Sequence, residues 1–158
     1  MLGVSEKGPL LSLSDENGNA RVMLSIAKND ESALTLWDEN GKHSVVLKEN
    51  KEGSGLWLSD QNGKQRALLA VSKEMSKMSL HDENGTGRAM VGILGETPML
   101  ALTDRKEMPR VILEVSEDEP KLDLRDENGK GRALVAVFKE TAAMGLRDKT
   151  GKVIWSAP

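Results

Sequence analysis

The sequence of 158 residues contains no cysteine, no tyrosine, one phenylalanine and only two histidines, His43 and His81. The absence of cysteine excludes disulfides, thiolate metal ligands and cysteine nucleophiles. Two histidines are too few for most imidazole-based catalytic or metal sites. The 22 lysines and arginines against 25 aspartates and glutamates give a net charge of −3. There is therefore no basic excess to hold a nucleic-acid backbone, and we expect no nucleic-acid partner.

Long apolar runs are also absent. The longest, such as residues 67–71, fall far short of the roughly 20 residues that a membrane-spanning helix needs. Acidic residues at Glu6, Asp15 and Glu16 interrupt the start of the chain, where a secretion signal requires an unbroken apolar segment. We therefore expect no membrane insertion of this segment, and its compartment stays open.

What the sequence does contain is a tandem repeat. Seven aspartates, each opening a turn-like tetrapeptide such as Asp-Glu-Asn-Gly, recur every 22 or 23 residues: Asp15, Asp38, Asp60, Asp82, Asp104, Asp126 and Asp148. Around each aspartate lies one template, apolar–x–apolar–x–Asp–x–Asn–Gly–Lys–x–Arg–Ala/Val–x–Leu–x–Val. Self-similarity at a fixed period of this length is typical of repeat architectures.

Each copy has the pattern of a β-hairpin. Apolar residues alternate before the turn, as in Leu11 and Leu13, and again after it, as in Val22, Leu24 and Ile26. A period of two indicates half-buried strands, and no stretch has a long helical period. The segments between copies are short and polar. The sequence therefore predicts an all-β antiparallel meander.

The apolar pattern also fixes the expected strand register. If Asn17 and Gly18 are the two central residues of a tight turn, Leu13 lies opposite Val22, and all alternating apolar residues share one face. Each template arginine then lies opposite the residue that precedes the aspartate. The seven turns are expected near Asn17, Asn40, Asn62, Asn84, Lys106, Asn128 and Thr150.

The predicted architecture is a single repeat domain over residues 1–158, with a lone strand at residues 1–5 followed by seven hairpins of about 22 residues. The array is elongated, curled or intertwined in an oligomer, and these alternatives stay open. A propeller is less favoured because no doubled period of 44 residues appears. Two interpretations of the lone strand also remain: a fragment of a longer array, such as a cell-surface or anchored protein, or a strand that completes a sheet elsewhere.

Two copies depart from the template. The copy at Asp104 lacks Asn-Gly and carries Pro109, so its hairpin is expected to be the least regular. The last copy places Trp155 where other copies have alanine or valine, and we interpret Trp155 as a cap on the end of the array.

The second face of the hairpins carries the candidate interface. An apolar row occupies one template position in six copies: Met23, Val46, Leu68, Met90, Ile112 and Leu134. Beside it, an arginine row comprises Arg21, Arg66, Arg88, Arg110 and Arg132, with Ser44 as the exception. Trp37 and Trp57 are expected to point outward on this face. A strand with two partly apolar faces is usually covered on both, so we expect a subunit or a ligand to pack on this surface.

The repeat resembles tandem motifs of the DxNGKxRAxLxV kind in uncharacterised bacterial proteins, and this resemblance implies no particular activity. More loosely, the short hairpins are similar to the YD and MORN repeats, although the YD tyrosine and the MORN glycine-aromatic signature are absent here. The alternating strands also resemble the triple β-spiral of viral fibre shafts, and that resemblance implies a homotrimer.

No motif in the chain indicates catalysis, and we expect neither an enzyme nor a bound cofactor. The Asp-x-Asn-Gly segment does not match an EF-hand, because the glycine falls at position 4 instead of 6, and a turn aspartate that binds its own backbone explains all copies. The favoured function is a structural or protein-interaction module that assembles with itself, with a trimer as the first expectation. The alternative is a module that binds carbohydrate or another surface polymer through the outward tryptophans and arginines.

Overall fold

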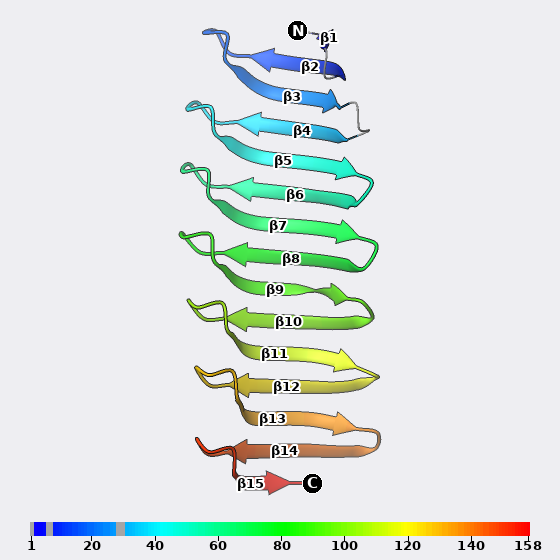
Figure 1. The fold of residues 1–158 in the computed structure, drawn as a ribbon, viewed down its shortest axis with the longest axis vertical. Helices are drawn as coiled ribbons and strands as arrows, with labels where there is room; N and C mark the ends of the chain where they lie inside the picture. Colours follow the sequence, from blue (N-terminus) through cyan, green and yellow to red (C-terminus); the bar gives the residue numbers. More distant parts are fainter. Residues whose placement is uncertain (1, 6–7, 28–30) are drawn as a thin grey trace. The chain divides into compact units, whose positions relative to one another are not determined.

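The fold was analysed in a computed structural model, which describes residues 2–5, 8–27 and 31–158. These residues form fifteen β-strands and no helix, which confirms the predicted all-β class (Figure 1). None of them belongs to a helix long and apolar enough to cross a membrane. The sequence predicts one repeat domain, and the structure divides the chain into two compact units, 1–85 and 86–158, each of which continues the same repeat.

The first unit contains eight strands: β1 (Leu2–Ser5), β2 (Gly8–Ser14), β3 (Ala20–Ile26), β4 (Ser32–Trp37), β5 (His43–Asn50), β6 (Gly53–Ser59), β7 (Gln65–Ser72) and β8 (Met75–His81). Each pairs antiparallel with the next in chain order. The predicted lone strand is present as β1, which pairs with β2; Met1 lies outside the described residues.

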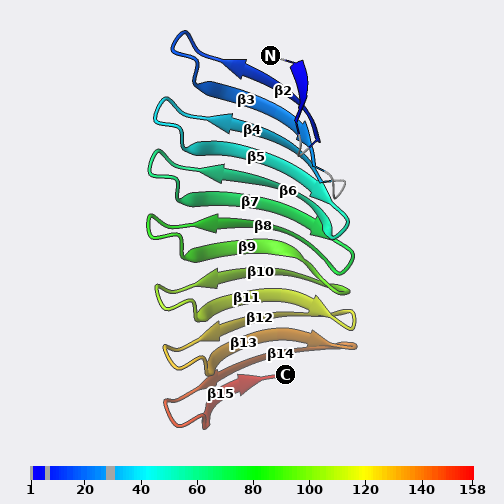
Figure 2. The same cartoon turned by 45° about the horizontal axis from the view of Figure 1, so that its top comes forward.

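The second unit contains seven strands: β9 (Gly87–Leu94), β10 (Thr97–Thr103), β11 (Pro109–Ser116), β12 (Glu119–Arg125), β13 (Gly131–Phe138), β14 (Thr141–Arg147) and β15 (Val153–Ala157). They also pair antiparallel in chain order. The strands of each unit are curved and twisted rather than flat, as Figure 2 shows.

The predicted register is confirmed, but the predicted turn is wrong. Leu13 lies opposite Val22, as expected. The turn, however, is a three-residue loop: the amide of Gly18 donates to the carbonyl of Asp15, and Gly18 has a φ of 83°. A type I turn followed by a left-handed residue is the usual form of such a loop. This longer turn alone would shift the register by one residue.

A β-bulge at the arginine position restores that register. In the first hairpin Ser14 pairs with Ala20 and Leu13 pairs with Val22, so Arg21 is the extra residue between them. The extra residue falls at the same template position in five further hairpins: Ser44, Arg66, Arg110, Arg132 and Ile154. The arginines therefore do not lie opposite the residue before the aspartate, because that residue pairs with the one before the arginine. A bulge leaves its extra residue outside the ladder and re-aims its side chain.

The hairpin at Asp104 keeps the regular geometry, contrary to the expectation. Its turn closes with the same two backbone hydrogen bonds as the other copies. Glu107 adopts the left-handed conformation, with a φ of 61°, that glycine adopts elsewhere. Pro109 is the first residue of β11, a position where a strand tolerates a missing amide proton.

Alternate residues of each strand point to opposite sides of the sheet, so the register defines two faces. The first, here called the leucine face, comprises the predicted alternating apolar set. In the first unit it contains Leu11, Leu13, Val22, Leu24, Ile26, Leu34, Leu36, Val45, Leu47, Leu56, Leu58, Ala67, Leu69, Val71, Met78 and Leu80. In the second unit it contains Ala89, Val91, Ile93, Leu100, Leu102, Val111, Leu113, Val115, Leu122, Leu124, Ala133, Val135, Val137, Met144, Leu146 and Trp155.

The opposite side, here called the mixed face, places small residues beside large ones on most neighbouring strands, although Val46, Trp57 and Leu68 are direct neighbours on β5, β6 and β7. Its large residues include the predicted apolar row, and its small residues include Ser12, Thr35, Ser79, Ala101, Ala136 and Gly145. The buried side chains of both units lie on this face: Thr35, Ser79, Ala101, Ile112 and Ala136.

Candidate functional site: the repeated turns and the two sheet faces

The turn aspartate organises its own hairpin. Oδ1 of Asp15 accepts hydrogen bonds from the amides of Asn17 and Asn19, at 3.0 and 2.9 Å. The same pair of bonds, from the second and fourth residues after the aspartate, recurs at Asp38, Asp60, Asp104, Asp126 and Asp148. An aspartate that binds the backbone two residues on is a standard turn-forming interaction.

These bonds favour the ionised carboxylate. At Asp38 the amide of Lys42 contributes most to lowering the pKa below its ordinary value, and at Asp104 the amide of Lys106 does. At Asp15 the largest contribution is partial desolvation, which raises the pKa, but the hydrogen bonds from Asn19 and Asn17 and the positive charge of Arg21 together outweigh it and the pKa is lowered. The pKa is also lowered at Asp60, Asp126 and Asp148.

The bulged arginine joins each hairpin to the next. Nε of Arg66 donates to the carbonyl of His81 at 3.1 Å, and the guanidinium lies 3.3 Å from Oδ2 of Asp60 in its own turn. His81 is the residue before the turn aspartate of the following hairpin. The corresponding carbonyls accept from Arg21, Arg88 and Arg110, and Arg132 donates to the carbonyls of Asp148 and Lys149. The arginine row is therefore engaged with the protein's own backbone.

The predicted apolar row is mostly covered by the sheet itself. Met23 lies directly between Ser12 and Thr35 on the neighbouring strands, and Ile112 lies between Ala101 and Asp123. Next to small neighbours a large side chain can lie down on the sheet. Ile112 is only 7% exposed, and the other five members of the row are half-buried.

The two tryptophans are half-buried rather than fully outward. Trp57 lies on the mixed face and packs over Gly55 of the same strand: a Cβ added to Gly55 would approach the indole ring to 2.5 Å. Trp37 makes an edge-to-face contact with His43, with ring centroids 5.4 Å apart. The structure therefore does not bring the two indoles into one described site.

The leucine face, by contrast, is open. Most of its large side chains are about half exposed, including Leu24 at 52%, Leu69 at 51% and Leu113 at 49%. Most positions of this face carry leucine, isoleucine, valine or methionine. The few small residues do not lead to burial of their neighbours: Ala67 lies between Leu58 and Leu80, which stay 39% and 49% exposed.

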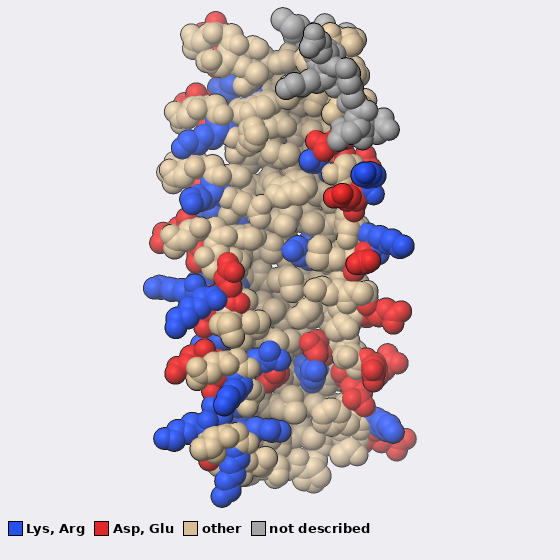
Figure 3. All heavy atoms as spheres, in the orientation of Figure 1, with Lys and Arg blue, Asp and Glu red and all other residues tan. Residues whose placement is uncertain are grey.

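The leucine face also carries almost no charge. In the second unit all its positions are apolar, and in the first Glu49 lies only at its edge, opposite Ser54. The space-filling view of one side of the molecule shows most charged side chains along the two ends of the strands and a smaller number over the middle (Figure 3).

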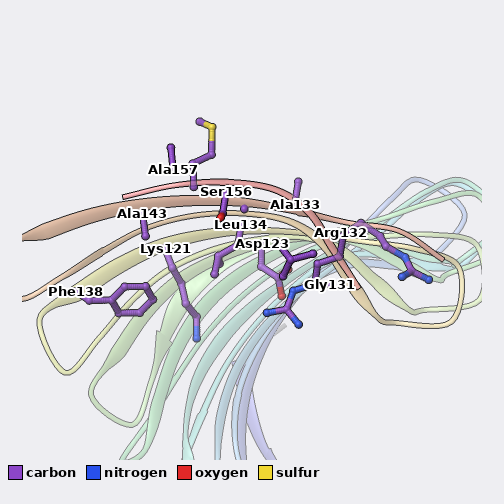
Figure 4. A pocket seen from close by; sticks show the side chains of 14 residues that line it. Lys121, Asp123, Gly131, Arg132, Ala133, Leu134, Phe138, Ala143, Ser156 and Ala157 are labelled. Atoms are coloured by element: carbon purple, nitrogen blue, oxygen red, sulfur yellow. The ribbon is translucent and has the colours of Figure 1, made fainter. Parts of the chain in front are cut away.

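The second unit has a hollow of about 510 Å³ on strands β12 to β15 (Figure 4). Lys121, Asp123 and Arg132 help to line it, and each already has an ionic partner: Glu114, Arg125 and Asp126. The hollow exists partly because Gly131, Ala143 and Gly145 leave space there. Among the described residues, no group of three or more histidine, aspartate or glutamate side chains gathers as a metal site.

The sequence matches no family model and no curated protein.

Proposed function

We propose that this chain is a non-catalytic structural repeat module that assembles with itself through a face of its β-sheet. The observation that carries the proposal is the single-layer construction: the described strands form one layer per unit, and no large side chain is fully buried. A sheet with an apolar face normally buries that face against a second layer, and no described segment of either unit supplies such a layer to its own sheet.

The accessible surface supports the same conclusion. The chain exposes 11187 Å². A globular monomer of 17.2 kDa exposes about 7,800 Å², and two separate globular units of half that mass expose about 9,400 Å² together. The excess over either reference is larger than the roughly 800 Å² that each partner buries in a standard protein interface.

The repeated polar residues support a structural role. The turn aspartates bind their own backbone, and the bulged arginines bind the next hairpin. A repeated charged residue held in this way contributes to the regularity of the array.

Binding of carbohydrate or another surface polymer has less support. The arginines that would contact such a ligand are engaged in hydrogen bonds within the chain, and Trp57 packs over Gly55.

The molar mass of the purified chain, measured by sedimentation equilibrium over a range of concentrations, tests the proposal. We expect a multiple of 17.2 kDa, with three chains as the prediction from the resemblance to fibre shafts. A mass of one chain at every concentration would remove self-assembly from the proposal.

A further inference from the structure

We infer that the leucine face is the assembly surface, and that its occupant is the leucine face of a second copy of this chain. This inference rests on the proposed function and names the surface and the partner. It replaces the row from Met23 to Leu134 as the candidate interface, because that row is already half-buried or buried on small neighbours.

The exposed apolar area is sufficient for a stable interface. Ten leucine-face side chains of the first unit are more than a third exposed: Leu11, Leu13, Leu24, Ile26, Leu47, Leu58, Leu69, Val71, Met78 and Leu80. In the second unit, twelve leucine-face side chains are more than a third exposed: Val91, Ile93, Leu100, Leu102, Leu113, Val115, Leu124, Val135, Val137, Met144, Leu146 and Trp155. At roughly 30–60 Å² of removable surface each, these side chains offer about 300–700 Å² per unit, and about 700–1,300 Å² for the two units together, a range that includes the roughly 800 Å² that each partner buries in a standard interface.

The chemistry of the face restricts its partner. A charge-free surface can be covered without an energetic penalty only by another charge-free surface, because a charged group buried there would have no counter-ion. Charged peptides, nucleic acids and acidic polymers are therefore poor occupants.

Within each unit, no described segment can cover this face. The strands are joined by connections of two or five residues, and all strands are used within the sheet. A covering layer must come from outside the unit.

The repeat spacing favours a copy of the same chain. Apolar positions recur along each strand every two residues and across the sheet at every strand, about 4.8 Å apart. Another leucine face has the same spacing, and two such faces pack about 10 Å apart with their side chains interdigitated. Because the same patch serves both partners, the contact closes on itself with two-fold symmetry, so this inference predicts two chains instead of the three that the resemblance to fibre shafts implies.

The absence of cysteine allows a direct test by single-cysteine labelling. We would prepare Leu69→Cys and Leu113→Cys, one on the leucine face of each unit. The matched controls are Leu94→Cys and Phe138→Cys, on the mixed face, whose native side chains are 40% and 42% exposed. Each variant is allowed to react with a maleimide, natively and in urea, at a concentration where its mass has been measured.

In an oligomer, the two leucine-face cysteines should react at least an order of magnitude more slowly natively than in urea, and the control cysteines should react rapidly in both. If the chain is oligomeric but the leucine-face cysteines react rapidly, the proposed function stands and the inference is wrong. If the chain is a monomer and all four cysteines react rapidly, both are wrong. Should a charged variant be needed to confirm the surface, Leu113→Glu is expected to lower the oligomer fraction, and Leu94→Glu to leave it unchanged.

Discussion

The two faces of the sheet differ in how they are covered. On the mixed face, Ile112 lies between Ala101 and Asp123 and reaches 7% exposure without a second layer. On the leucine face, Leu113, the adjacent residue in the same strand, lies between Leu100 and Leu122 and stays 49% exposed. The comparison shows that two apolar side chains of one strand can differ sevenfold in exposure, so apolar character alone does not tell which face the sheet itself covers.

The largest effect is expected from substitutions in that adjacent pair. Ile112→Ala removes a buried side chain and should lower the free energy of unfolding by about 2–4 kcal/mol. In a dissociated chain Leu113→Ala should cost only about 1 kcal/mol, because half of the side chain is exposed there. Urea denaturation at low protein concentration measures both values.

The same two substitutions also test whether the leucine face is covered when the chain is assembled. If a second copy covers the leucine face, the cost of Leu113→Ala should rise toward that of Ile112→Ala as the protein concentration increases. Equal costs for Leu113→Ala at all concentrations would mean that no partner covers this side chain.

Enlarging a small residue should destabilise the chain when the residue lies on the mixed face, but not when it lies on the leucine face. Ala136→Leu places extra atoms at a position that is 2% exposed and should cost about 1–3 kcal/mol through overpacking. Ala142→Leu adds the same atoms to an exposed position on the leucine face, opposite Val137, and should change the stability of the dissociated chain by less than about 0.5 kcal/mol. Thermal unfolding of the two variants is the measurement, and similar losses for both would contradict the assignment of the faces.

Acid should lower the stability of the chain through the turn aspartates, without a direct effect on the side chains of either face. The pKa of six turn aspartates is lowered in the folded chain, so the ionised form binds the native turn better than the protonated form does. The resulting stabilisation is present above the ordinary aspartate pKa of about 3.9 and is lost as the pH falls through the folded value.

Unfolding by urea at pH 6, 4 and 3 measures this loss. Asp60→Asn, which keeps an oxygen acceptor but removes the charge beside Arg66, should reduce the acid sensitivity. Stability that is independent of pH over this range would contradict the assigned role of the aspartates.

The smallest effect is expected at the irregular turn. Glu107→Gly relieves a left-handed conformation in a residue with a Cβ and should stabilise the chain by about 0.5–1 kcal/mol, after the entropic cost of glycine. Gly85→Ala, at a φ of 84° with open space around it, is the reverse change and should destabilise by a similar amount. Differential scanning calorimetry can resolve the two shifts, and a loss of stability in Glu107→Gly would show that the glutamate has a role beyond the turn.

The strand register could be predicted from the sequence because a one-residue slip would place Arg21 opposite Leu13 and mix the two faces. The bulge could not be predicted in this way. A two-residue turn and a three-residue turn with a compensating bulge give the same pairing of Leu13 with Val22, so the apolar pattern does not distinguish them.

The leucine face was not proposed as the assembly surface from the sequence, although a signal for its exposure was present. The row from Met23 to Leu134 stood out as apolar residues on the second face, but its burial depends on the small residues opposite, such as Ser12 and Thr35. Comparing residue sizes across the expected register, strand by strand, would have found this difference. The hydrogen bond from Arg66 to the carbonyl of His81, which links one hairpin to the next, depends on the bulge and could be found only from the structure.

The central claim, that two leucine faces meet, is tested most directly by intermolecular distances between spin labels. A label at Ser54→Cys lies at the edge of the leucine face, and a label at Lys77→Cys lies on the mixed face of the same unit. Pulsed dipolar spectroscopy should detect a short intermolecular distance for Ser54→Cys, which disappears when labelled chains are diluted with unlabelled ones, and a longer or undetectable distance for Lys77→Cys. No intermolecular coupling at Ser54→Cys, or a shorter distance at Lys77→Cys, would contradict the account.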